Sequence, residues 1–127
     1  MATSRDESKP IVLITGAAGN IGTSLAGLLG SSYDIVGLDR PGSSAEFPLI
    51  EADLGDGESV EKAIAGFQRK FGDSIASVVH LAAFFDFTGE ENPLYRSINV
   101  EGTRQVLRAL QPLEVEQFVY CGTMLVH

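Results

Sequence analysis

Short apolar runs along the chain alternate with longer stretches in which apolar residues recur every three or four positions. Apolar, β-branched runs bounded by Gly, Pro or Asp are typical of strands covered on both faces. They predict five strands, at residues 11–15, 34–39, 47–53, 75–81 and 118–121. The helical spacing predicts three helices: one carrying Ile21, Leu25, Leu28 and Leu29 and ending at Gly30, one carrying Val60, Ala63, Ile64, Phe67 and Phe71 with Asp56 and Gly72 as its caps, and one from about Pro93 to Ala109.

Strands that alternate with helices predict βαβ units, whose crossover connections build a parallel sheet with helices on both faces. Five such strands predict an α/β fold with a doubly wound parallel sheet, most simply in the strand order 3-2-1-4-5. Ligands of such sheets bind at the carboxyl ends of the strands, here between the first and the fourth strand, where the order reverses. Residues 1–9 are polar and are expected to form a flexible leader to a domain at residues 10–127.

Composition excludes several classes of protein. The chain has 127 residues, enough for one domain or part of one, and its single cysteine, Cys121, excludes a disulfide framework and a multi-cysteine zinc site. A net charge of −8 disfavours nucleic acid as a partner. No residue from Pro10 to Tyr33 is charged, but the longest aliphatic run there, at 11–14, is too short for a membrane span or a signal peptide. We therefore expect a cytoplasmic protein without a membrane partner or a metal site.

Three glycines, Gly16, Gly19 and Gly22, follow the first predicted strand and open the first helix. A tight strand-to-helix turn needs the conformational freedom of glycine, and a pyrophosphate reaches backbone N–H groups only where no Cβ intervenes. A plain turn would account for two of these glycines. All three in this context favour a turn that binds a dinucleotide.

An acidic residue, Asp39, ends the second predicted strand, where it could accept hydrogen bonds from the adenosine ribose. A hydrogen bond to a charged acceptor contributes about 1.5 to 3 kcal/mol. A 2′-phosphate at the same place would instead cost up to roughly 4 kcal/mol in charge repulsion, at about 4 Å and an effective dielectric near 20. NAD is therefore expected rather than NADP. The alternatives are that Asp39 is a solvated strand end, and that Arg40 either accepts a 2′-phosphate or, as we favour, is a solvated surface residue.

Six motifs in this order resemble the extended short-chain dehydrogenases/reductases, the group of nucleotide-sugar epimerases and dehydratases. They are Thr15-Gly16-Ala17-Ala18-Gly19-Asn20-Ile21-Gly22, Gly37-Leu38-Asp39, Asp53-Leu54, Val79-His80-Leu81-Ala82-Ala83, Asn99-Val100-Glu101-Gly102-Thr103 and Phe118-Val119-Tyr120-Cys121-Gly122-Thr123. The resemblance covers essentially the whole chain. It implies a Rossmann fold, with residues 10–127 as a dinucleotide-binding domain that is incomplete at its carboxy end.

The resemblance also implies contacts with the cofactor. The implied residues are Gly16, Ala18, Gly19, Asn20, Ile21 and Gly22 in the turn, Asp39 and Arg40 at the ribose, Asp53 and Leu54 at the adenine, Leu81, Ala82 and Ala83 beneath the sugars and phosphates, and Asn99. From the residues alone, Asp53 could equally be an acidic loop residue before the next helix instead of an adenine contact. Residues 81–83 could be a plain buried strand end. Asn99 and Thr103 would face the cofactor or brace the fourth strand, and His80 is expected to be a core histidine rather than a proton donor.

The implied catalytic residue is Thr123, which would hydrogen-bond the substrate oxygen while hydride passes between the substrate and the nicotinamide. In the family a Tyr-x-x-x-Lys pair supplies the base, but Tyr33, Tyr95 and Tyr120 are each followed by another residue at the lysine position. Gly122 and His127 also depart from the family pattern. We expect the chain to be inactive alone, its parent to continue into Tyr-x-x-x-Lys and to form a homodimer, and its uncovered faces to expose apolar surface.

Two other functions remain open from the sequence. A dinucleotide-binding sensor or regulatory module would use the same fold without turnover. A methyltransferase-like chain would bind S-adenosylmethionine instead of NAD. Only Phe84, Phe85, Asp86 and Thr123 would face a small-molecule substrate, and they do not distinguish a nucleotide sugar from a steroid-like or small keto substrate.

Overall fold

The computed structural model describes residues 9–53, 56–81 and 93–120, without the side chains of 93–99. Five strands form a parallel sheet: β1 (Ile11–Thr15), β2 (Asp34–Asp39), β3 (Leu49–Glu51), β5 (Ser77–His80) and β7 (Phe118–Tyr120). Their spatial order is β3-β2-β1-β5-β7, so the doubly wound sheet and the predicted order 3-2-1-4-5 are confirmed. The helices are α1 (Asn20–Leu29), α2 (Gly57–Phe71) and α3 (Pro93–Ala109).

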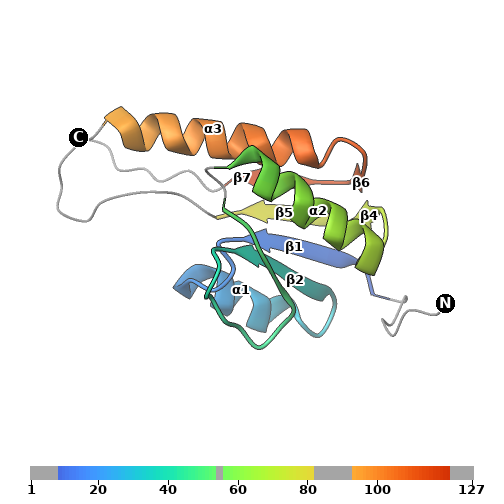
Figure 1. The fold of residues 1–127 in the computed structure, drawn as a ribbon. Coiled ribbons are helices and arrows are strands. Elements are labelled where there is room, and N and C mark those ends of the chain that lie inside the picture. The colour runs from blue at the N-terminus through green and yellow to red at the C-terminus, as the bar shows by residue number, and fades with distance from the viewer. Residues whose placement is uncertain (1–8, 54–55, 82–92, 121–127) are drawn as a thin grey trace.

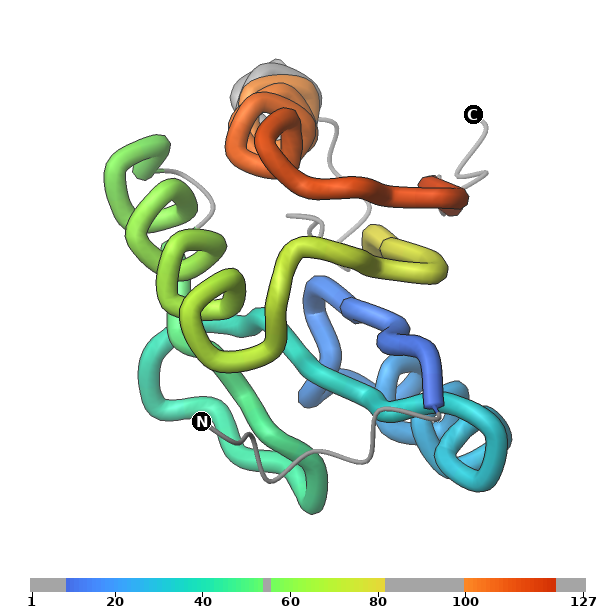
Figure 2. The backbone as a smooth tube through the Cα atoms, turned by 90° about the vertical axis from the view of Figure 1, so that its right-hand side faces the viewer, coloured from blue at the N-terminus to red at the C-terminus, as the bar shows by residue number. Residues whose placement is uncertain are grey.

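The sheet is covered on both faces, as Figures 1 and 2 show, with α2 and α3 on one face and α1 on the other. Neighbouring residues of β1 alternate between the two sides: Leu13 packs with residues of α2 and α3, whereas Val12 and Ile14 pack on the α1 side. Every residue of β1 is buried. This two-sided burial is the reason that the strand reads as an unbroken apolar run.

Two predicted strands are shorter than the sequence indicates. The strand expected at 75–81 is interrupted at Ala76, whose N–H donates to the carbonyl of Ile11. The residues before the interruption form β4 (Ser74–Ile75), which pairs with β6 (Glu114–Val115) in a separate two-stranded parallel sheet. The strand expected at 47–53 covers only β3. Pro48 has no N–H to donate to a ladder, which accounts for the later start of β3.

The ends of α2 agree with the prediction, whereas the buried face of α1 agrees only in part. Asp56 caps α2 by accepting a hydrogen bond from the N–H of Glu58, and Gly72 follows the helix with a φ of 100°. In α1, however, Ile21 and Leu28 are 69% and 78% exposed, so the predicted apolar stripe is wrong at these two positions.

The buried residues of α1 are small. They are Gly22 and Ala26. A Cβ added to Gly22 would lie 2.6 Å from the backbone oxygen of Ala17, much closer than real Cβ atoms approach a carbonyl oxygen. The start of the helix therefore lies directly against the backbone of the turn that precedes it, while Leu25 and Leu29 are partly buried and pack on the core at this face of the sheet.

Three large apolar residues of α3 and of the edge strand β7 are exposed: Val100, Leu107 and Tyr120. They border one surface hollow with Arg104 and Arg108. This agrees with the expectation of exposed apolar surface, and self-association stays a prediction. Among the described residues, no helix combines the length and apolar character needed to cross a bilayer.

The close approach at Gly22 leaves no room for a side chain at this position. Gly22→Ala should lower the free energy of unfolding by about 1 to 3 kcal/mol, because its Cβ meets backbone rather than a flexible side chain. Gly27→Ala is the matched control on the same helix, since a Cβ there meets nothing within 4 Å, and it should stabilise the chain by about 0.5 to 1 kcal/mol. Urea unfolding followed by circular dichroism measures both changes, and equal effects of the two substitutions would contradict the packing described here.

Candidate functional site

The turn between β1 and α1 is fastened to the neighbouring strand. Gly16 has a φ of 69°, a conformation that residues with a Cβ rarely adopt. Its N–H donates to the carbonyl of Leu38 in β2 at 2.8 Å, and the N–H of Gly19 donates back to the carbonyl of Gly16 at 3.2 Å. The turn is therefore held in one shape at the carboxyl edge of the sheet.

The N-terminus of α1 lies at this edge with its backbone exposed. Within the described part of the chain, no side chain caps this helix and no acidic residue occupies its first turn. Gly19, Asn20 and Ile21 are all exposed. The first N–H groups of a helix have no acceptor within it and carry a partial positive charge, so this end of α1 is suited to an anion.

Gly19 is not required by the fold. Its φ of −76° and ψ of 177° are open to any residue. A Cβ added there would contact only the oxygen of Gly16, at an ordinary 3.5 Å. Backbone conformation explains Gly16 and close packing explains Gly22, but neither explains Gly19. The absence of a side chain at Gly19 leaves space beside the exposed N–H groups.

Asp39 ends β2 beside the turn, and its carboxylate is bound to backbone. Oδ2 accepts from the N–H of Ala18 at 2.9 Å, and Oδ1 accepts from the N–H of Arg40 at 2.7 Å. The sequence indicated a ribose-binding acid but not that the same acid braces the glycine turn. No local signal could have shown it, because Ala18 and Asp39 are 21 positions apart and meet only through the β1–β2 pairing.

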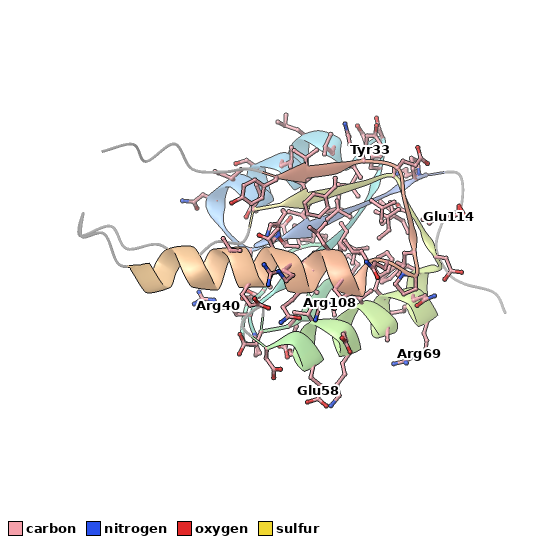
Figure 3. The ribbon with its side chains drawn as sticks, turned by 90° about the horizontal axis from the view of Figure 1, so that it is seen from above. Tyr33, Arg40, Glu58, Arg69, Arg108 and Glu114 are labelled. Carbon is pink, nitrogen blue, oxygen red and sulfur yellow. The ribbon has the colours of Figure 1, made fainter. Side chains whose placement is uncertain are left out.

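The other described candidates lie around this edge. Arg40 is exposed, and Figure 3 shows it at the end of the molecule opposite Glu114. Asp53 is exposed in the loop before α2, where its N–H donates to the hydroxyl of Ser59. Leu81 is half-buried directly after β5.

A buried hydrogen-bonded cluster lies beneath the same edge. His80 is 2% exposed, with Nδ1 at 2.7 Å from the hydroxyl of Thr15 and Nε2 at 3.0 Å from the hydroxyl of Thr103. Burial lowers the pKa of His80 below its usual value, which favours the neutral imidazole. The expectation of a core histidine is confirmed, and Thr103 braces the strand that carries it.

Several candidates fall outside the described residues: Leu54, Ala82, Ala83, Phe84, Phe85, Asp86, Gly122, Thr123 and His127. Asn99 lies within α3, but its side chain is also outside the description. The structure therefore gathers Gly16–Gly22, Asp39, Arg40 and Leu81 at one edge of the sheet. Across residues 9–53, 56–81 and 93–120, no group of three or more His, Cys, Asp or Glu could hold a metal ion.

Known proteins similar to this chain share both its sequence pattern and its fold. Residues 12–126 match the profile of the NAD dependent epimerase/dehydratase family. The chain is 31% identical to N-acetyl-alpha-D-glucosaminyl-diphospho-ditrans,octacis-undecaprenol 4-epimerase of Escherichia coli O157:H7, over 91% of this chain and 33% of that protein. It is 33% identical to 3-beta-hydroxysteroid dehydrogenase of Mycolicibacterium neoaurum, over 88% of this chain and 31% of that protein.

A solved structure is similar as well. The short-chain dehydrogenase/reductase superfamily protein of Agrobacterium tumefaciens with bound NAD superposes with a TM-score of 0.66 at 29% identity, covering 87% of this chain and 31% of that one. The chain thus spans about a third of the length of these relatives. The match over residues 12–126 covers nearly all of its own length, and on that basis the chain belongs to the NAD dependent epimerase/dehydratase family.

Proposed function

We propose that the chain binds NAD along the carboxyl edge of its sheet, as the cofactor-binding portion of an enzyme that transfers hydride between the nicotinamide and a hydroxyl or keto carbon of its substrate. The observation that carries this proposal is Gly19, a glycine that neither the backbone nor the packing requires. A diphosphate bound against the first N–H groups of α1 would explain why position 19 is a glycine, because a side chain there would occupy the diphosphate's place.

The surrounding residues fit such a ligand. Asn20 and Ile21 are exposed at the same rim, and Ala18 joins the rim to Asp39. Gly16 and Gly22 shape the turn and its close packing. By analogy with the family, Asp53 and Leu54 would lie at the adenine, and Leu81, Ala82, Ala83 and Asn99 along the rest of the cofactor. We assign these residues to NAD binding as a proposal that site-directed variants can test.

Asp39 supports NAD over NADP. Each carboxylate oxygen has two acceptor sites, so the two backbone bonds leave one site on each oxygen for a ribose hydroxyl. Because the turn itself holds the carboxylate in place, Asp39 cannot swing away from a 2′-phosphate without giving up the bond to Ala18. Arg40 is the residue that would offset this repulsion, and its exposure supports our preference for a solvated role.

The proposed enzyme requires residues beyond this chain. Thr123 would hydrogen-bond the substrate oxygen, and a Tyr-x-x-x-Lys pair later in the parent polypeptide would exchange its proton. NAD would supply the hydride acceptor. The named relatives include an epimerase of a diphospho-linked sugar and a steroid dehydrogenase, so they support an alcohol or ketone substrate without selecting its class.

Gly19→Ser tests the diphosphate site directly. Serine is a favourable N-cap and the fold has room for its Cβ, so the free energy of unfolding should stay the same or rise. NADH affinity, measured by fluorescence titration, should fall about tenfold or more because the side chain enters the proposed site. Gly27→Ala, on the outer part of the same helix, should leave the affinity unchanged. Retained NADH affinity in Gly19→Ser would contradict the proposed function.

Asp39→Asn tests the choice of cofactor. An amide has one oxygen and cannot replace both carboxylate oxygens, so NAD affinity should fall about tenfold or more. NADP affinity should fall less, because the repulsion of its 2′-phosphate is also removed. Asp73→Asn is a matched control at an exposed acid before β4 and should change neither. Calorimetry with both dinucleotides measures the change, and tighter binding of NADP than NAD by the unaltered chain would refute the assignment.

The continuation of the polypeptide tests the enzymatic role. A parent with Tyr-x-x-x-Lys should reduce NAD with an alcohol substrate or oxidise NADH with a ketone substrate. Thr123→Val should lower kcat about a hundredfold, while Thr123→Ser retains most of it. Steady-state kinetics on the parent measure this. A parent that lacks the Tyr-Lys pair would instead favour a dinucleotide sensor.

A further inference from the structure

The His80 cluster lies at the point where the strand order of the sheet reverses. Thr15 and His80 are the last residues of the two central strands, β1 and β5, and they face each other in the parallel ladder. Their side chains join at 2.7 Å, and Thr103 completes the cluster from α3 at 3.0 Å. Ligands of doubly wound sheets bind in the crevice just outside this point.

The imidazole makes the two threonine contacts interdependent. A neutral histidine has one donor and one acceptor nitrogen, so one threonine hydroxyl donates to the ring and the other accepts from it. The role that Thr103 takes at Nε2 therefore determines whether Nδ1 donates to Thr15 or accepts from it. A change at α3 is transmitted in this way to the end of β1.

Thr15 also binds the backbone of Leu81 at the crevice. Its hydroxyl and its carbonyl oxygen both accept from the N–H of Leu81, each at 3.1 Å. The residue that follows Thr15 is Gly16, the first residue of the glycine turn. The cluster thus joins the start of that turn to the first residue after β5, on the two sides of the crevice.

We propose that His80 is a positioning residue, which through Thr15 holds Leu81 and Gly16 in the relative placement that the nicotinamide half of the cofactor requires. This inference rests on the proposed function. Asp39 at the end of β2 would take the adenosine half, so a dinucleotide that crosses the glycine turn places its other half on the β5 side. The cluster lies at the ends of β1 and β5, next to that side.

The ring itself is held by more than its hydrogen bonds. Tyr120 stacks on His80 with ring centroids 5.9 Å apart, and Phe118 contacts it at 6.0 Å, both from β7. Loss of the Thr103 hydroxyl alone therefore leaves the imidazole packed against the sheet while it removes the bond that sets the ring's donor and acceptor. This makes Thr103, which lies on α3 and not in the glycine turn, the most informative position to change.

The experiment compares two ligands on Thr103→Val and Thr103→Ser. NADH occupies both halves of the proposed site, whereas AMP occupies only the adenosine half. Thr103→Val should weaken NADH binding by about fivefold or more and leave AMP affinity within about twofold, and Thr103→Ser should restore NADH affinity. A parallel loss of both ligands in Thr103→Val, or unchanged NADH affinity, would overturn the positioning role.

A second measurement uses the unaltered chain and so does not depend on the stability of a variant. The ring nitrogen resonances of His80, recorded by ¹⁵N NMR, should be those of a single neutral tautomer and should shift with NADH but not with AMP. Insensitivity to NADH would overturn the inference. If the unaltered chain binds neither ligand, the proposed function itself fails, and this outcome is distinct from failure of the positioning role alone.

Discussion

The hydrogen bonds between the glycine turn and the end of β2 are the constraint on which the proposed site depends. Leu38 and Asp39 accept from the N–H groups of Gly16 and Ala18, so the turn is fixed to the sheet at two points. With these donors engaged, the N–H groups at the start of α1 are left at the rim. The same carboxylate that braces the turn retains acceptor sites for a sugar. Under the proposed function, Asp39 would set both the shape of the turn and the choice of cofactor, and a change there would affect both.

Much of the fold follows from local sequence. The apolar run of β1, flanked by Pro10 and Gly16, predicted a strand buried on both faces, and Asp56 and Gly72 marked the ends of α2 because caps act through neighbouring backbone. The face of α1 was harder to predict. The hydrophobic pattern is read from large apolar residues. The residues of α1 that are buried, however, are Gly22 and Ala26, whose small size allows close approach but buries little apolar surface. The pairing of β4 with β6, which lies far along the chain, was likewise not visible in the local sequence.

The position of the candidate site could be predicted from the sequence, but the hydrogen bonds that connect its residues could not. Glycine spacing after a strand located the turn, and an acid at the end of the next strand located Asp39, because both patterns have direct physical causes. The bond from Ala18 to Asp39 and the Thr15–His80–Thr103 cluster join residues that are 21, 65 and 23 positions apart. Such contacts arise only once the sheet order is set, and the sequence pattern marked His80 as buried without showing its partners.

In the proposed function, the rim of the glycine turn receives the diphosphate of a dinucleotide. The most direct measurement is a titration of the ¹⁵N-labelled chain with NAD, followed through the backbone amide resonances. The largest shifts should occur at Gly19, Asn20 and Ile21, with smaller ones at Asp39 and Leu81. Saturable binding whose shifts leave those three amides unmoved, or no binding at millimolar NAD, would contradict the proposed function.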